Sequence, residues 1–115
     1  DGQIVGRGHN LTETLADVTA HAEMQAITAA ANTLGGKYLS QCTLYVTVEP
    51  CVMCAGAIGW AQIKRVVYGA SDEKRGFTVF APKALHSKCT VLSGILETEC
   101  RELMQLFFAQ KRAKL

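Results

Sequence analysis

Apolar side chains recur along this chain with two periods, and each period predicts one kind of element. Apolar and polar residues alternate over residues 41–48, which is the two-residue period of a strand with one buried face. An apolar stripe at helical spacing predicts a helix over residues 19–34. Thr19 is suited to be its N-cap, and Gly35 is suited to end it. A helix followed by a strand is therefore the first unit of the expected fold.

Five further segments complete the expected element order. A helix is expected over residues 50–61, because a proline fits a first helical turn. Strands are expected over residues 3–8, 65–69 and 91–96, and a final helix over residues 97–113. The face of this last helix that is expected to be buried consists of Cys100, Leu103, Met104, Phe107 and Phe108. Strands that alternate with helices predict an α/β domain with helices on both faces of a mixed sheet.

Composition limits the class of protein. A chain of 115 residues corresponds to one domain, residues 1–115. The hydrophobic fraction of 49% and the charged fraction of 19% exclude a disordered or fibrous chain. No apolar run approaches the roughly 18–20 residues of a membrane span, and no secretory leader is recognisable, so we expect a cytoplasmic protein without a membrane partner. The net charge of +2 is too small to indicate nucleic-acid binding by itself.

The first two residues raise a question about the extent of the domain. Asp1 and Gly2 form the dipeptide favoured at the centre of a two-residue hairpin turn, and such a turn joins two strands. Only the strand expected after the turn, over residues 3–8, is present in the sequence. We therefore expect residues 1–115 to be most of a slightly longer domain.

The cysteines point to a metal site. There are five of them, which is too few for a disulfide scaffold, and metal or redox use is favoured in a reducing compartment. Cys51 and Cys54 are three residues apart in a predicted first helical turn, so both sulfurs can reach one ion. The helix N-terminus favours their thiolate form. His21, near the start of the other helix, supplies a third ligand if the two helix ends meet.

Three ligands predict a catalytic zinc site rather than a structural one. A structural zinc site is usually closed by four protein ligands, and the other cysteines and histidines have no partner at metal-ligand spacing. Three ligands leave a position for water. Glu23 is near enough to take a proton from that water and pass it on, first as general base and then as general acid. An isolated C-x-x-C also fits a redox pair or half a zinc finger, but H-x-E followed by P-C-x-x-C resembles the signature of zinc nucleobase deaminases and favours catalytic zinc over structural zinc or coincidence.

Beyond this motif, the sequence resembles the bacterial tRNA-specific adenosine deaminases. The matching stretches are residues 19–23, 44–58, 65–70 and 94–100. The resemblance implies a three-layer α/β/α cytidine deaminase-like fold with a mixed five-stranded sheet, whose first helix and strand would precede residue 3. It implies hydrolytic deamination of adenosine to inosine at the wobble position of tRNA. One Zn²⁺ would be held by His21, Cys51 and Cys54, with Glu23 as the catalytic acid and base.

The resemblance also implies contacts with the tRNA substrate. Asn10 matches a position that contacts the flipped base, which we favour over the alternative of a loop asparagine that bonds its own backbone. Asp72 matches a residue near the preceding nucleotide, although it also suits an ordinary turn. Lys74 and Arg112 are candidates for a phosphate path, with solvated surface as the alternative. Phe108 and its neighbour match two aromatic positions, of which one would join the core and the other would support or stack on RNA.

Two other functions remain open on the sequence. Ile58, Trp60 and Ala61 resemble the same segment of guanine deaminases, so the alternative function is deamination of guanine or of another free nucleobase or nucleoside. A non-catalytic RNA-binding or structural zinc subunit is less compatible with the presence of Glu23. The family resemblance further implies a homodimer that acts on the tRNA anticodon loop. Trp60 would then be either a dimer contact or a core residue.

Overall fold

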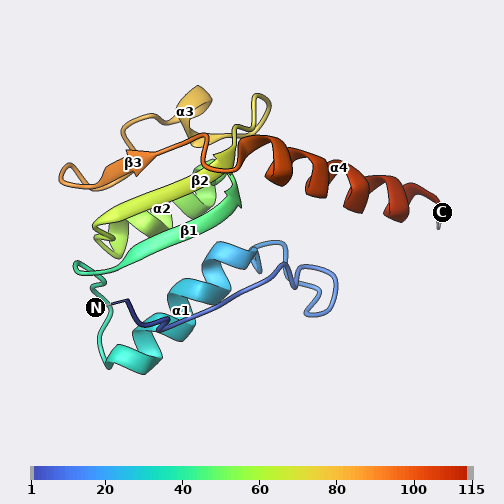
Figure 1. Ribbon diagram of the computed structural model, residues 1–115. Helices are drawn as coiled ribbons and strands as arrows, with labels where there is room; N and C mark the ends of the chain where they lie inside the picture. The colour runs from blue at the N-terminus through green and yellow to red at the C-terminus, as the bar shows by residue number, and fades with distance from the viewer. Residues whose placement is uncertain (1, 114–115) are drawn as a thin grey trace.

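A computed structural model describes the backbone of residues 2–113 and the side chains up to Phe107. The elements in chain order are α1 (Ala22–Leu34), β1 (Thr43–Val48), α2 (Val52–Trp60), β2 (Arg65–Ala70), α3 (Phe77–Phe80), β3 (Thr90–Leu92) and α4 (Glu97–Ala113). The described strands form one sheet in the order β1-β2-β3, and every pairing is parallel. Figure 1 shows β2 between its two neighbours. The α/β class expected from the sequence is confirmed.

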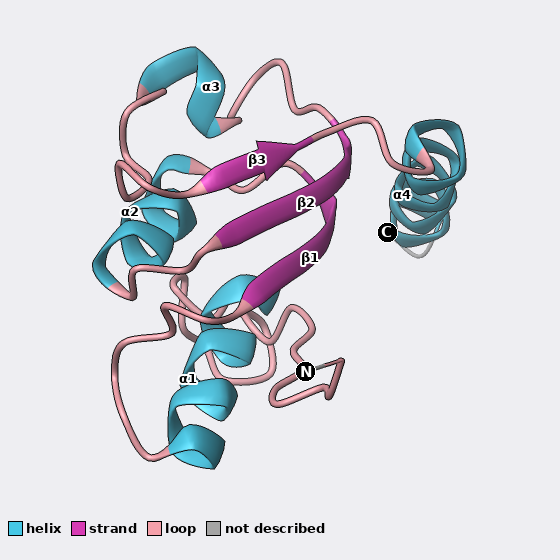
Figure 2. Ribbon diagram, turned by 60° about the vertical axis from the view of Figure 1, so that its left-hand side comes forward, coloured by secondary structure: helices cyan, strands magenta, loops and turns pink. Residues whose placement is uncertain are grey.

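Helices cover the sheet from two sides. Figure 2 shows α1 and α2 together on one side and α4 on the opposite side. The main core lies between the sheet and the first two helices, where Ile58 of α2 and Val66 of β2 are fully buried. Tyr68 packs in the same core with its ring edge-to-face against Phe77, at 6.5 Å between ring centroids. The opposite face of β1 carries the exposed Tyr45, in agreement with the alternation that predicted this strand.

The strand expected over residues 3–8 is not formed. These residues run along α1 instead, as the dark-blue segment in Figure 1 shows. A Cβ atom at Gly6 or Gly8 would collide with the α1 backbone at Ala26 or Ala22. The two glycines therefore serve a close approach to a helix rather than a strand pairing. Without this strand, the part of the sheet that the structure describes is parallel and three-stranded, not mixed.

The first helix begins later than expected. Its N-cap is His21, and Thr19 lies outside the helix. The backbone N–H and the hydroxyl of Thr19 both donate to Oδ1 of Asp17, at 2.8 and 2.7 Å, which forms a local turn and lowers the pKa of Asp17. The C-terminal prediction is confirmed, because Gly35 adopts a φ of 72° and its N–H bonds to the carbonyl of Ala31.

The last helix has the expected bounds, but its apolar face is only partly buried. Cys100 and Met104 are half-buried, whereas Leu103 and Phe107 are 57% and 51% exposed. The first turn of α4 rests on β2, where a Cβ atom at Gly69 would collide with the Cys100 side chain. Beyond this turn α4 extends past the sheet (Figure 1). The amphipathic stripe therefore predicted the helix correctly and its burial incorrectly.

Two short elements differ from expectation. The four-residue helix α3 was not expected, because so short a segment shows no helical period. Strand β3 ends at Leu92, earlier than expected, and the chain turns at Gly94 with a φ of 77°. Among residues 2–113, no helix combines the length and the apolar character that crossing a bilayer requires.

Candidate active site

Three possible metal ligands meet where two helices begin. His21 is the N-cap of α1, Cys51 is the N-cap of α2, and Cys54 lies in the first turn of α2. Cys51 follows β1 by a few residues, so the group lies at the carboxyl end of the parallel strands. This edge is the usual place for a site in an open α/β sheet. The convergence of the two helix ends that the motif required is therefore present.

The geometry of the group fits a zinc ion. The three ligand atoms lie within 4.8 Å of one another. Nδ1 of His21 is 3.6 Å from Sγ of Cys51 and 3.5 Å from Sγ of Cys54. With Zn–S bonds of ~2.3 Å and a Zn–N bond of ~2.0–2.1 Å, a tetrahedral ion holds sulfur and nitrogen ~3.6 Å apart. The donor set and its spacing therefore suit zinc without rearrangement.

The helix caps explain how these side chains are available. Ser, Thr, Asp and Asn are the usual N-caps, because their oxygens accept from the free N–H groups of the first turn. Neither His21 nor Cys51 makes such a bond to its own helix. Their side chains face each other instead, at 3.6 Å between Nδ1 and Sγ. The N-cap side chains of both helices are therefore free to bind a metal ion together.

The Cys54 thiol is the most perturbed group of the site. Burial raises the pKa of Cys54 far above its usual range, and the nearby charges of Glu23 and Cys51 raise it further. The Glu23 carboxylate is therefore close enough to the Cys54 thiol to disfavour its thiolate form. In the metal-free chain Cys54 is therefore protonated at neutral pH. A bound cation would displace that proton, which is the usual coupling of thiolate ligation to pH.

Glu23 lies beside the ligand group without belonging to it. It occupies the first turn of α1, two residues after His21, and its carboxylate is near enough to raise the pKa of Cys54. It is outside the set of three side chains whose ligand atoms lie mutually within 4.8 Å. A carboxylate in this place can exchange a proton with a group bound at the open fourth position of a three-ligand zinc.

The remaining cysteines do not complete a four-ligand site. Cys42, Cys89 and Cys100 are free and half-buried, and they come from other parts of the chain. Among residues 2–107, no fourth histidine, cysteine or carboxylate joins the group of three. The described part of the chain therefore offers an open site.

The structure places two of the proposed substrate contacts near the site. Asn10 is exposed, and its Oδ1 accepts from the N–H and hydroxyl of Thr12 at 2.9 and 2.8 Å. The next residue, Leu11, donates to the carbonyl of Ala20 at 2.9 Å, so Asn10 lies close to the start of α1. Asp72 is attached to the residues that lead into α2, because Oε1 of Glu49, two residues before Cys51, accepts from the Asp72 N–H at 3.1 Å.

The other proposed contacts belong to the turn after β2 and to the last helix. Lys74 is exposed in the turn after β2, where its N–H donates to Oδ1 of Asp72 at 3.0 Å. Phe108 and Arg112 belong to the later turns of α4, which extend past the sheet (Figure 1). Their side chains lie outside the described residues.

One buried residue beside the site belongs to none of the sequence motifs considered above. Glu49 is 4% exposed and is the one buried polar or charged residue within the described part of the chain. Its carboxylate accepts three hydrogen bonds from the segment that follows β2. The only sign of its role in the sequence is a charged residue placed between an apolar strand and the P-C-x-x-C motif, where a buried position is expected.

Comparison with known proteins agrees with this geometry. The family model of the MafB19-like deaminases matches residues 1–112. A tRNA-specific adenosine deaminase of Streptococcus pyogenes serotype M18 is 44% identical over 99% of this chain and 75% of its own length. The tRNA-specific adenosine deaminase of Bacillus subtilis is 41% identical over 99% of this chain and 74% of its own length.

Solved structures show the same relationship. A tRNA:A34 deaminase from work on A-to-I editing at the wobble position superposes with a TM-score of 0.80, at 44% identity over 89% of this chain and 78% of its own. A guanine deaminase of Bacillus subtilis is 49% identical but matches only 62% of this chain and 45% of its own, with a TM-score of 0.61. The cytidine deaminase-like fold is thereby confirmed. On this evidence the chain belongs to the tRNA-specific adenosine deaminase family.

Proposed function

We propose that this chain is a zinc-dependent hydrolase that converts adenosine to inosine at the wobble position of tRNA. The observation that carries the proposal is the open group of His21, Cys51 and Cys54 with the Glu23 carboxylate at its edge. Membership in the tRNA-specific family supports adenosine as the target base. The reaction adds one water to adenosine, forms a bond from oxygen to C6 and releases the amino group as ammonia.

Each residue of the site has a distinct part in this reaction. Zinc, when bound by the three ligands, supplies a Lewis acid that makes water nucleophilic at neutral pH. Glu23 takes a proton from the attacking water, delivers a proton to N1 of the ring and assists the departure of ammonia. The burial of Cys54, which is fully inaccessible, limits competing solvent at the ligand.

The substrate contacts are proposed around this centre. Asn10 would hydrogen-bond the flipped base, and Asp72 would contact the nucleotide before it. Lys74 and Arg112 would follow the phosphates, and Phe108 would support or stack on RNA. The anticodon loop would thus be bound across the carboxyl edge of the sheet, between the loops before α1 and after β2.

A substrate comparison tests the proposed function. The zinc-loaded chain is expected to convert the wobble adenosine of an anticodon stem-loop to inosine, which sequencing reads as a change from A to G. It is expected to release no ammonia from guanine under the same conditions. Ammonia from guanine together with unchanged RNA would establish the guanine deaminase instead. Neither product, with zinc bound, would favour a non-catalytic subunit.

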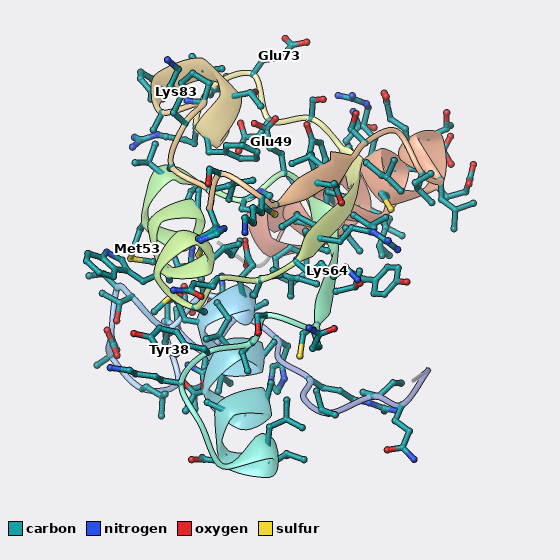
Figure 3. The ribbon with its side chains drawn as sticks, turned by 90° about the vertical axis from the view of Figure 1, so that its left-hand side faces the viewer. Tyr38, Glu49, Met53, Lys64, Glu73 and Lys83 are labelled. Atoms are coloured by element: carbon teal, nitrogen blue, oxygen red, sulfur yellow. The ribbon has the colours of Figure 1, made fainter. Side chains whose placement is uncertain are left out.

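We also propose that the chain works in the cytoplasm, where tRNA is its substrate, and that it forms a homodimer through α2. The outer side of α2 is apolar: Val52, Met53 and Trp60 are 41%, 36% and 85% exposed, and Figure 3 shows Met53 pointing away from the sheet. An open hollow of about 370 Å³ lies beside the indole and is lined by Gly56, Gly59, Ala84, Leu85 and His86. A second copy of α2 would cover both features by two-fold symmetry.

The dimer has a direct test in sedimentation. Trp60→Glu is expected to convert a dimer to a monomer, because a charge would replace the apolar centre of the contact. Val18→Glu is the matched control, since Val18 is 84% exposed in the loop before α1 and is expected to leave the dimer intact. An unmodified chain that sediments as a monomer at micromolar concentration would contradict the proposal.

A further inference from the structure

The buried Glu49 carboxylate connects two parts of the chain that are distant in sequence. Its Oε1 accepts from the N–H of Asp72 at 3.1 Å. Its Oε2 accepts from the N–H of Thr78 at 2.9 Å and from the Thr78 hydroxyl at 2.6 Å. No lysine, arginine or histidine forms an ion pair with it among the residues that the structure describes. Three hydrogen-bond donors thus replace a counter-ion for a buried charge.

Backbone contacts place this connection directly at the zinc site. The N–H of Glu49 donates to the carbonyl of Ala70 at 2.8 Å, which continues the pairing of β1 with β2. The N–H of Phe77 donates to the carbonyl of Pro50 at 3.0 Å, and Gly76 forms an antiparallel bridge with Cys51. The segment of residues 72–78 is therefore seated on the residues that lead into α2. One of those residues is the ligand Cys51.

Gly76 and Asp72 let the segment of residues 72–78 pack closely against the Glu49 carboxylate. A Cβ atom at Gly76 would collide with the Glu49 carboxyl group and with the Asp72 carbonyl. The Asp72 side chain in turn accepts from the N–H groups of Lys74 and Arg75, both at 3.0 Å. Asp72 therefore stabilises the turn through hydrogen bonds within it, and Glu49 bonds the turn to the residues that precede α2. Figure 3 shows the contrast with Glu73, which extends away from the same turn while Glu49 lies beneath it.

We propose that Glu49 is a positioning residue, whose buried carboxylate fixes the segment of residues 72–78 against the junction that carries Cys51. This role rests on the proposed function, because Asp72 and Lys74 in that segment are proposed substrate contacts. The hydrogen bonds of the Glu49 carboxylate go to Asp72 and Thr78, so we assign it no direct part in binding the metal or the RNA. It fixes the position of residues 72–78 relative to the metal site. The nucleotides beside the target base are thereby bound in the place that brings the base to the metal and Glu23.

The first test is Glu49→Gln in the zinc-loaded chain. Glutamine keeps the size of the side chain but turns an NH₂ group toward one of the donors, which then lacks an acceptor. Hydrogen exchange at the Asp72 and Thr78 amides is expected to accelerate by about tenfold or more, with exchange in β1 unchanged. The matched control, Glu73→Gln, removes the same charge from an exposed side chain and is expected to leave these amides protected. Unchanged exchange in Glu49→Gln would overturn the proposal.

The second readout is kinetic. With the anticodon stem-loop as substrate, Glu49→Gln is expected to raise KM by about tenfold, with kcat and zinc stoichiometry nearly unchanged, because binding is lost and the chemistry is not. A fall in kcat with loss of zinc and constant KM would overturn the positioning role. If even the unmodified chain leaves RNA unchanged, the proposed function fails, but the exchange experiment still decides whether Glu49 fixes the loop.

Thr78 gives a test that does not disturb the buried charge. Thr78→Val removes the hydroxyl that bonds Oε2 at 2.6 Å and keeps the shape of the side chain. It is expected to accelerate amide hydrogen exchange in the segment and to raise KM, as Glu49→Gln does. Both effects are expected to be smaller, because the backbone N–H of residue 78 still bonds the carboxylate. Thr78→Ser restores the hydroxyl and is expected to restore both values. Equal behaviour of the valine and serine variants would contradict the proposal.

Discussion

Replacement of Glu23 by glutamine is expected to lower kcat by about 10²–10⁴-fold while zinc stays bound. Glutamine has the size of glutamate but cannot take a proton from water or deliver one to a base. The metal is expected to remain, because Glu23 is not among the three mutual neighbours that form the ligand group. Its negative charge also raises the pKa of the Cys54 thiol, so its removal does not oppose formation of the thiolate. Steady-state deamination of the stem-loop measures kcat, and zinc analysis of the purified variant measures metal occupancy.

A control is available on the same molecule. Glu73→Gln removes an exposed carboxylate in the turn after β2 and is expected to change kcat by less than about twofold, as surface substitutions generally do. Retention of more than about a tenth of the activity by Glu23→Gln would contradict the assigned role. Loss of zinc by the same variant would place Glu23 in the ligand set instead. Comparison of Glu23→Gln with Glu73→Gln therefore separates the loss of proton transfer from the effect of removing one negative charge.

The elements with their own local signals could be predicted from the sequence. The alternation that predicted β1 reflects one face against the core and another that carries the exposed Tyr45. Residues 3–8 show why the same reasoning fails elsewhere. A strand needs a partner with free backbone groups, and nothing within those residues specifies one. Gly6 and Gly8 instead allow contact with α1, which depends on the tertiary structure.

The same division applies to the site. Cys51 and Cys54 were predictable, because two cysteines three positions apart at the start of a helix, here the N-cap and a first-turn residue, present their sulfurs on the same side. His21 was predictable because α1 and β1 run in opposite directions. The start of α1 and the end of β1, where α2 begins, therefore lie at the same edge of the sheet. The role of Glu49 was not predictable, since its carboxylate accepts hydrogen bonds from residues 23 and 29 positions away, Asp72 and Thr78. A periodicity of two or of 3.6 residues contains no information about contacts at such separations.

Replacement of Cys54 by alanine is expected to abolish zinc binding and to reduce deamination by at least about a thousandfold. Two ligands, His21 and Cys51, would remain, which is fewer than the three that a catalytic zinc requires from protein. The metal's contribution to the transition state amounts to several kcal/mol, and each ~1.4 kcal/mol changes the rate tenfold. Cys54 is fully buried, so alanine also leaves a small void, but a sulfur atom is too small a loss to unfold the domain by itself.

Controls with the other cysteines separate ligation from packing. Cys42→Ala and Cys89→Ala remove half-buried thiols that pack against the core and lie outside the ligand group. Both are expected to retain one zinc per chain and most of the activity. Thermal unfolding with and without a chelator completes the comparison, because a metal that binds only the folded chain raises its stability. A chelator is therefore expected to lower the Tm of the unmodified chain and of both controls, and to leave the Tm of Cys54→Ala unchanged. A shift in Cys54→Ala equal to that of the unmodified chain would mean that zinc is held elsewhere.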